Sequence, residues 1–93
     1  MFIGLLTIEL EITDSLTLKD KRQVVKSLLD RIRHRFNVSA AEVDRLDSRR
    51  FAVMAAVAVA NEEAFVHRML EKVTDLVESE PRSLVLGHQI EML

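Results

Sequence analysis

The chain opens with an alternation of apolar and polar residues over Phe2–Ile12, which is cleanest toward its end. A period of two is typical of a strand with one buried face. One side of this predicted strand carries Phe2, Leu6, Ile8, Leu10 and Ile12. The other side carries Ile3, Leu5, Thr7, Glu9 and Glu11. We expect the uniformly apolar first set to face the core.

The pattern then changes to the 3.6-residue period of an amphipathic helix, which should run to about Arg35. Thr17 is a suitable N-cap, and Asp20 stands at the third helical position, as in a variant of the capping box. The apolar stripe of this helix comprises Leu18, Val25, Leu28, Leu29, Ile32 and Phe36. The stripe predicts that the helix lies on the sheet.

Residues 37–43 are too short for another helix and predict a strand, followed by turn residues at 44–48. The segment 51–60 is ambiguous, because its alanines favour a helix. Phe51, Val53, Val57 and Val59 at alternate positions favour a strand. We interpret this segment as a strand.

A second amphipathic helix is predicted over 62–79, with Asn61 as a candidate cap and Pro81 beyond its end. Its apolar positions are Phe65, Met69, Val73, Leu76 and Val77. Residues 83–93 then predict a last strand, with Leu84, Leu86, His88, Ile90 and Met92 on one side.

The predicted order is β-α-β-β-α-β over a single domain of residues 1–93, which places the chain in the α+β class. Two β-α-β halves with a tight link between the second and third strands give a four-stranded antiparallel sheet with both helices on one face, the ferredoxin-like sandwich. The other face of the sheet stays open. Side chains there must be solvated or covered by a ligand or a partner.

Composition narrows the functional classes. The chain has no cysteine, which excludes disulfides, thiolate metal sites and cysteine nucleophiles. No stretch is long enough for a membrane span, and the apolar start leads into acidic residues instead of a cleavage site. We therefore expect a cytoplasmic protein without a membrane partner.

The three histidines do not indicate catalysis. His34 and His67 lie opposite the apolar stripes of their helices, so we expect both to be solvated. Glu63, His67 and Glu71 share one helix face, but such a metal site would be exposed and unsupported. His88 falls among apolar residues and predicts a partly buried, hydrogen-bonded histidine.

The residues argue against two classes of protein that share this fold, one enzymatic and one RNA-binding. Acylphosphatases need a glycine-rich anion loop after the first strand, whereas Thr13–Thr17 has no glycine. RNA-recognition modules stack bases on open-face aromatic residues, whereas Phe2 and Phe51 are expected in the core. We predict no catalytic residues, no metal and no cofactor.

The open face is the first candidate functional surface. We expect Ile3 and Leu5 of the first strand there, together with Ala52, Met54, Ala56, Ala58 and Ala60 of the third. Open faces usually carry polar residues, so this run predicts a homodimer interface that includes Ile3, Leu5, Met54 and Ala56. The alternatives are a tolerated alanine surface or a segment that is not a strand.

The first helix is the second candidate. Residues 19–36 hold seven basic and two acidic side chains, a local charge of +5 in a chain whose net charge is −2. Lys19, Arg22, Lys26 and Arg33 fall on one helix face and form what we call the basic stripe. The stripe predicts contacts to phosphates, with a solvated face as the alternative.

One family resemblance is carried by Leu16–Arg22 (LTLKDKR), Val24–Arg31 and Arg35–Val43 (RFNVSAAEV). These segments resemble the bacterial YlxP-like family, a domain of unknown function. The resemblance implies a ferredoxin-like fold and a small cytoplasmic protein, often encoded beside translation and ribosome-maturation genes. If the motif is functional, the matching positions are Lys19, Asp20, Lys21, Arg22, Lys26 and Asn37. Alternatively, Asp20, Lys21 and Arg22 fix the helix start by capping and ion pairing.

These observations lead to two functional hypotheses. The first is a non-enzymatic module that associates with ribosomal RNA or a ribosomal assembly through Lys19, Lys21, Arg22, Lys26 and Arg33. The second is a dimeric interaction or small-ligand-sensing module that uses the apolar open face.

Overall fold

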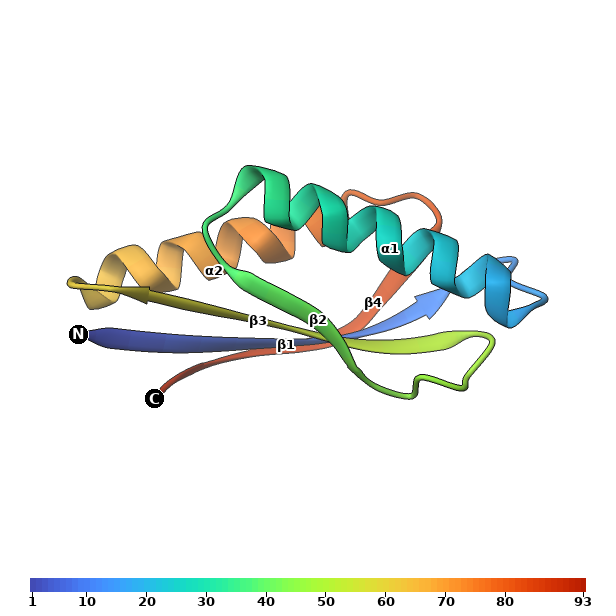
Figure 1. The fold of residues 1–93 in the computed structure, drawn as a ribbon, viewed down its shortest axis with the longest axis horizontal. Coiled ribbons are helices and arrows are strands. Elements are labelled where there is room, and N and C mark those ends of the chain that lie inside the picture. The colour runs from blue at the N-terminus through green and yellow to red at the C-terminus, as the bar shows by residue number, and fades with distance from the viewer.

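The computed structural model describes all 93 residues and has the predicted element order. The elements are β1 (Phe2–Ile12), α1 (Leu18–Arg35), β2 (Ser39–Asp44), β3 (Phe51–Ala60), α2 (Glu63–Glu78) and β4 (Ser83–Met92). The strands form one antiparallel sheet in the order β2-β3-β1-β4. Both helices lie on one face of this sheet and leave the other face bare (Figure 1). The ferredoxin-like prediction is therefore confirmed.

The start of α1 is fixed by a reciprocal capping box, as the sequence predicts. The Thr17 hydroxyl accepts a hydrogen bond from the backbone N–H of Asp20 at 3.0 Å. The Asp20 carboxylate accepts from the N–H groups of Leu16 at 3.2 Å and Thr17 at 3.1 Å. These bonds favour the ionised carboxylate and lower the pKa of Asp20. The helix ends at Arg35, and the backbone N–H of its C-cap residue, Phe36, donates a hydrogen bond to the carbonyl of Ile32.

The core lies between the two helices and the face of the sheet that they cover. Four of the five residues of β1 that the alternation predicts for the core are buried: Leu6, Ile8, Leu10 and Ile12. Phe2, at the end of the strand, is 39% exposed and is not part of the core. The helices contribute Val24, Val25, Leu28, Leu29, Ile32, Val66, Leu70, Val73, Leu76 and Val77. Apolar burial on this one face is the main stabilising term of the fold.

The predicted orientation of β3 is wrong. Met54 and Ala56 are 2% and 3% exposed and lie on the helix side of the sheet, so neither belongs to the open face. The pairings Ile8↔Met54 and Leu6↔Ala56 place them beside core residues of β1. Large β1 side chains fill the space under the helices, and the small residues of β3 complement them.

The prediction that alternate residues of the last strand share one side of the sheet is also only partly right, because a β-bulge interrupts β4. Glu9 pairs with Gly87 while Leu10 pairs with Val85, so β4 contains one extra residue at this point. On the two sides of the bulge, residues of the same sequence parity therefore face opposite sides of the sheet. Leu84 and Leu86 lie on the open side, whereas His88 lies on the helix side opposite Ile8. His88 is exposed and has no side-chain hydrogen bond, so the prediction of a hydrogen-bonded, partly buried histidine is wrong.

The second helix differs from its prediction in two details. Its N-cap is Glu62, not Asn61, and no side chain caps it. Phe65 is 47% exposed, while the neighbouring Val66 is fully buried. The buried stripe of α2 is thus displaced by one residue at its start.

No helix of the structure is both long and apolar enough to cross a membrane.

Gly4 allows α2 to approach β1 closely. A Cβ at this position would lie 2.6 Å from Cγ1 of Val66 and 2.8 Å from Cδ1 of Leu70. We predict that Gly4→Ala destabilises the fold by about 1–3 kcal/mol through overpacking. Chemical denaturation measures this change. The matched control is Gly87→Ala, whose Cβ would meet no atom within 4 Å. Equal stability of the two variants would contradict the packing argument.

Candidate functional site

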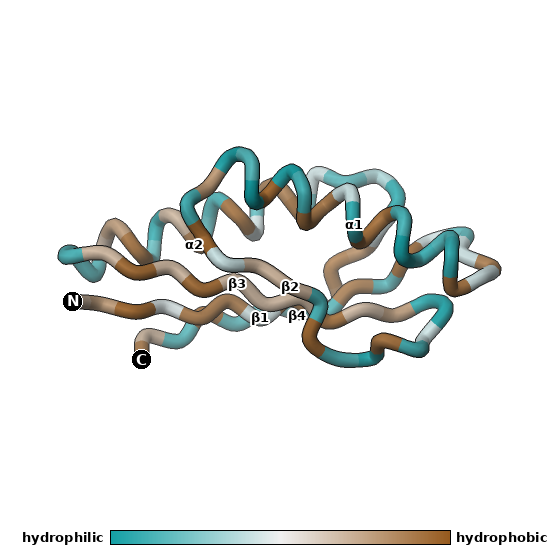
Figure 2. Tube along the Cα trace, in the orientation of Figure 1, coloured by the Kyte–Doolittle hydropathy of each residue, from teal (hydrophilic) through white to brown (hydrophobic).

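The open face of the sheet carries a continuous apolar surface. Ile3 pairs with Val59, Leu5 with Val57 and Ala41 with Ala55, so these side chains lie together on the side away from the helices. Val53 continues the row along β3. We call these seven residues the open-face patch. In Figure 2 the tube of β3 shows no hydrophilic colour along its length.

The patch is exposed in this single chain. Val59 and Val57 are 58% and 39% exposed, and Ile3, Leu5, Val53 and Ala55 are half-buried. An apolar surface of this kind on an antiparallel sheet is unusual, because the uncovered face normally carries polar residues. The expectation of an apolar open face therefore holds for Ile3 and Leu5. Its third-strand members, however, are the valines and not Met54 and Ala56.

Acidic side chains border the patch on the β4 side. Glu9 and Glu91 are exposed and have no ion-pair partner. Glu11 pairs with Arg50, next to Phe51. The ring of Phe51 lies on this open side, half-buried under Arg45, whose Cζ is 4.6 Å from the ring centroid. Phe51 was expected in the core and is not part of it.

Lys21 is completely buried, so it is not available to contact nucleic acid. Its Nζ lies 2.8 Å from a carboxylate oxygen of Glu42 and donates to the carbonyls of Arg45, Leu46 and Phe51 at 3.0, 3.4 and 3.3 Å. This network joins α1 to both strands of the β2–β3 hairpin and to the loop between them. The prediction of Lys21 as a phosphate contact is therefore corrected: a buried ammonium must be fully hydrogen-bonded, and these four oxygens achieve that.

The basic stripe on α1 is partly neutralised by neighbouring groups. Lys26 pairs with Asp30 at 2.7 Å, and this pair lowers the pKa of Asp30. Arg33 donates to the carbonyl of Ala40 at 2.6 Å and lies 3.9 Å from Asp30. Lys19 and Arg22 are exposed and form no ion pair or side-chain hydrogen bond. Only these two members of the stripe present an uncompensated charge.

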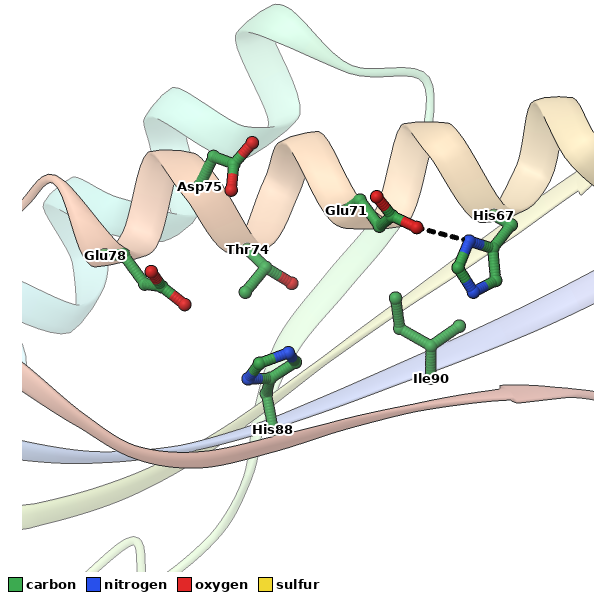
Figure 3. Close-up of a pocket in the computed structure, with 7 residues that line it drawn as sticks. All are labelled: His67, Glu71, Thr74, Asp75, Glu78, His88 and Ile90. Carbon is green, nitrogen blue, oxygen red and sulfur yellow. Dashed lines mark ion pairs between the residues drawn. The ribbon is translucent and has the colours of Figure 1, made fainter.

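A polar hollow of about 430 Å³ lies between α2 and β4 (Figure 3). Its lining includes His67, whose Nδ1 lies 2.6 Å from a carboxylate oxygen of Glu71. His88 points from β4 toward Thr74 and Glu78 on the helix (Figure 3). No group of three or more histidine, aspartate or glutamate side chains is arranged to hold a metal ion.

Glu80 is the second buried charge and joins the end of α2 to α1. Its carboxylate is 3% exposed and binds Arg82 at 2.9 Å and Arg31 of α1 at 2.5 Å. The hydrogen bond from the Arg82 side chain is the main cause that lowers the pKa of Glu80 from 4.5 to about 2. Glu80 thus fixes the turn before β4 against the helix layer.

The sequence comparison identifies the family. A family model described as a protein of unknown function, DUF503, matches residues 3–90. The chain belongs to the DUF503 family. The uncharacterised protein YlxP of Bacillus subtilis (strain 168) is 32% identical over 79 residues, which cover 85% of this chain and 86% of YlxP. The YlxP-like resemblance is therefore confirmed.

Two solved structures resemble this DUF503 chain only at the level of a distant fold match. One is a tyrosine transposase, described as bound to a REP hairpin, with 10% identity and a TM-score of 0.44. The other is LarC2, the C-terminal domain of a cyclometallase, with 8% identity and a TM-score of 0.43. The matches cover 98% and 100% of this chain, but the chain spans only 55% and 56% of those structures.

The structure gives the LTLKDKR motif of this DUF503 chain a structural role. Asp20 caps α1 and Lys21 forms the buried ion pair. We predict that Lys21→Met lowers the free energy of unfolding by about 3–5 kcal/mol, because it leaves Glu42 and the hairpin carbonyls without their donor. Adding Glu42→Leu should recover part of this loss. The control Lys26→Met should change stability by less than about 1 kcal/mol, because its pair is exposed. Denaturant titrations of the wild type and the three variants measure these free energies of unfolding. A Lys21→Met variant as stable as the wild type would refute the structural role of Lys21.

The lowered pKa of Glu80 predicts that the protein loses stability in acid. Its folded pKa lies below its ordinary value, so it stabilises the fold above about pH 5 and loses this effect as the pH falls toward 2. The shift corresponds to roughly 3 kcal/mol. In Glu80→Gln, stability should fall less steeply between pH 5 and 2 than in the wild type. Glu78→Gln, at an exposed position without an ion pair, should keep the wild-type slope. Parallel curves for the wild type and Glu80→Gln would contradict the assignment.

Proposed function

We propose that this protein is a non-enzymatic interaction module that forms a homodimer through the open face of its sheet. The observation that carries the proposal is the open-face patch, which one chain leaves uncovered. Burial of such a patch against a second copy removes apolar surface from water at no cost in unpaired backbone groups, because the strands already pair with one another.

The dimensions of the face support a second copy as the partner. Three strands of ten or eleven residues and one of six, about 4.8 Å apart, present roughly 590 Å² per subunit. Two such faces bury about 1,200 Å² in total, which lies at the lower end of specific interfaces. We therefore expect a reversible dimer with micromolar affinity.

Charge and side-chain size favour one arrangement of the two sheets. Ala41 and Ala55 are paired neighbours and make a flat area, with Val53 and Val57 on either side along β3. A two-fold axis near Ala55 brings the valines of both copies together and leaves Glu91, two strands away from β3, at the rim, while Glu9 lies beside Val53. An axis near β4 would instead oppose the unpaired glutamates of the two copies, which costs free energy.

The dimer prediction is tested by Val57→Glu, at the centre of the patch. The variant should be monomeric and folded, because the site is exposed in a single chain. The control Gln23→Glu adds the same charge on the exposed side of α1 and should stay dimeric. Light scattering and sedimentation velocity measure the masses, and circular dichroism checks the fold. A wild-type monomer at about 100 µM, or a dimeric Val57→Glu, would refute the proposal.

An RNA- or ribosome-associated module in the cytoplasm is the second candidate. The exposed and unpaired charges of Lys19 and Arg22 favour it. Fewer basic residues are free to contact RNA than the sequence suggests, because Lys21 is buried and Asp30 compensates the charges of Lys26 and Arg33. The variants of these two residues in the experiment below test this candidate directly.

A further inference from the structure

A groove between the end of α1 and the start of α2 combines positive charge with aromatic surface. It has a volume of about 430 Å³ and is lined by Arg35, Phe36, Asn37, Phe65, Arg68, Met69 and Lys72. A second hollow of about 470 Å³ shares Arg35, Phe36 and Lys72 and continues the groove along α2. A volume of this order is typical of pockets for small organic ligands.

The positive charge of the groove is not compensated. Arg35, Arg68 and Lys72 are exposed, and none of them forms an ion pair or a side-chain hydrogen bond. The first hollow contains no acidic residue, and the continuation contains only Asp75. Of the other ten basic side chains, six have a carboxylate or carbonyl partner. Three free cations in one groove therefore make a local site for an anion.

The aromatic surface has an independent structural origin. Phe65, Arg68, Met69 and Lys72 follow the i, i+3, i+4, i+7 spacing and so share one face of α2. This face is displaced from the buried stripe, which explains why Phe65 is 47% exposed beside the fully buried Val66. Phe36 closes the groove from α1, with Cζ of Arg35 at 5.9 Å from its ring centroid.

From this juxtaposition we infer that the groove binds a nucleotide unit, either free or within a single-stranded nucleic acid. A planar base stacks on Phe65, and the cations contact phosphate oxygens. Asn37 supplies an exposed amide that is able to donate and accept hydrogen bonds at a base edge. The site lies on the helix layer and does not overlap the open-face patch.

The test measures binding of fluorescently labelled single-stranded octanucleotides by anisotropy across a salt series, with unlabelled ADP as the free-nucleotide competitor. Arg68→Glu combined with Lys72→Glu should weaken octanucleotide binding at least tenfold and reduce the salt slope by about 1.4. Phe65→Ala should weaken binding at least threefold at unchanged salt slope, because stacking carries no ionic term. Competition by ADP at millimolar concentration assigns the site to free nucleotides, and its failure assigns the site to the polymer.

The matched controls are Lys19→Glu combined with Arg22→Glu, which changes charge equally on the other end of α1, and Leu84→Ala, which trims an exposed apolar residue on the open side. Both should bind as the wild type does. The inference is overturned if the α1 pair weakens binding as much as the groove pair, which would favour the basic stripe. It is also overturned if Phe65→Ala leaves affinity unchanged, or if the wild type does not bind at low salt. The monomeric Val57→Glu variant should bind normally, so the outcomes of this test and of the dimer test are independent.

Discussion

The ion pair between Lys21 and Glu42 is the contact on which the arrangement of the sheet depends. Lys21 is fully buried, and its Nζ also binds three carbonyls of the β2–β3 hairpin, so the hairpin has one position in which all these oxygens have a donor. Glu42 must therefore face the helices. Because Glu42 pairs with Met54, Met54 faces the helices as well, and the valines of β3 are placed on the opposite side. A structural contact at the start of α1 thus determines which residues the open face presents.

This role changes the functional interpretation of the family motif. In a sequence, LTLKDKR is a basic segment that suggests phosphate binding. In the structure, Asp20 caps the helix and Lys21 anchors the hairpin, so two of its charged residues serve the fold. Lys19 and Arg22 of the motif stay exposed and unpaired. Two larger surfaces without internal partners lie elsewhere: the open-face patch on one side of the molecule and the cationic groove on the other. A dimer formed through the first would present two copies of the second at its outer surfaces, as two binding sites in one assembly.

The sequence predicts the fold well because each element has a strong local signal. The alternation in β1, the capping box of α1 and Pro81 after α2 are all visible without tertiary information. The sequence alone does not show which side of β3 faces the core, because both of its sides are apolar and periodicity does not choose between Val57 and Ala56. The choice depends on the contact of Lys21 with Glu42, on pairing with β1 and on the volume left under the helices. The facing of β3 and the burial of Lys21 are thus set by contacts between distant segments, which explains why the predicted interface included Met54 and the predicted RNA site included Lys21. The bulge in β4 depends on such contacts as well.

The open-face dimer is tested most directly by an isotope-filtered NOE experiment on a mixture of methyl-labelled and unlabelled protein. Such a spectrum reports only contacts between different copies of the chain. We predict intermolecular NOEs to the methyl groups of Val53, Val57 and Val59, and none to the buried methyl groups of Val66 and Leu70 on α2. Intermolecular NOEs confined to the helix layer, or a complete absence of them at a concentration where scattering shows a dimer, would contradict the assignment of the open face as the self-association surface.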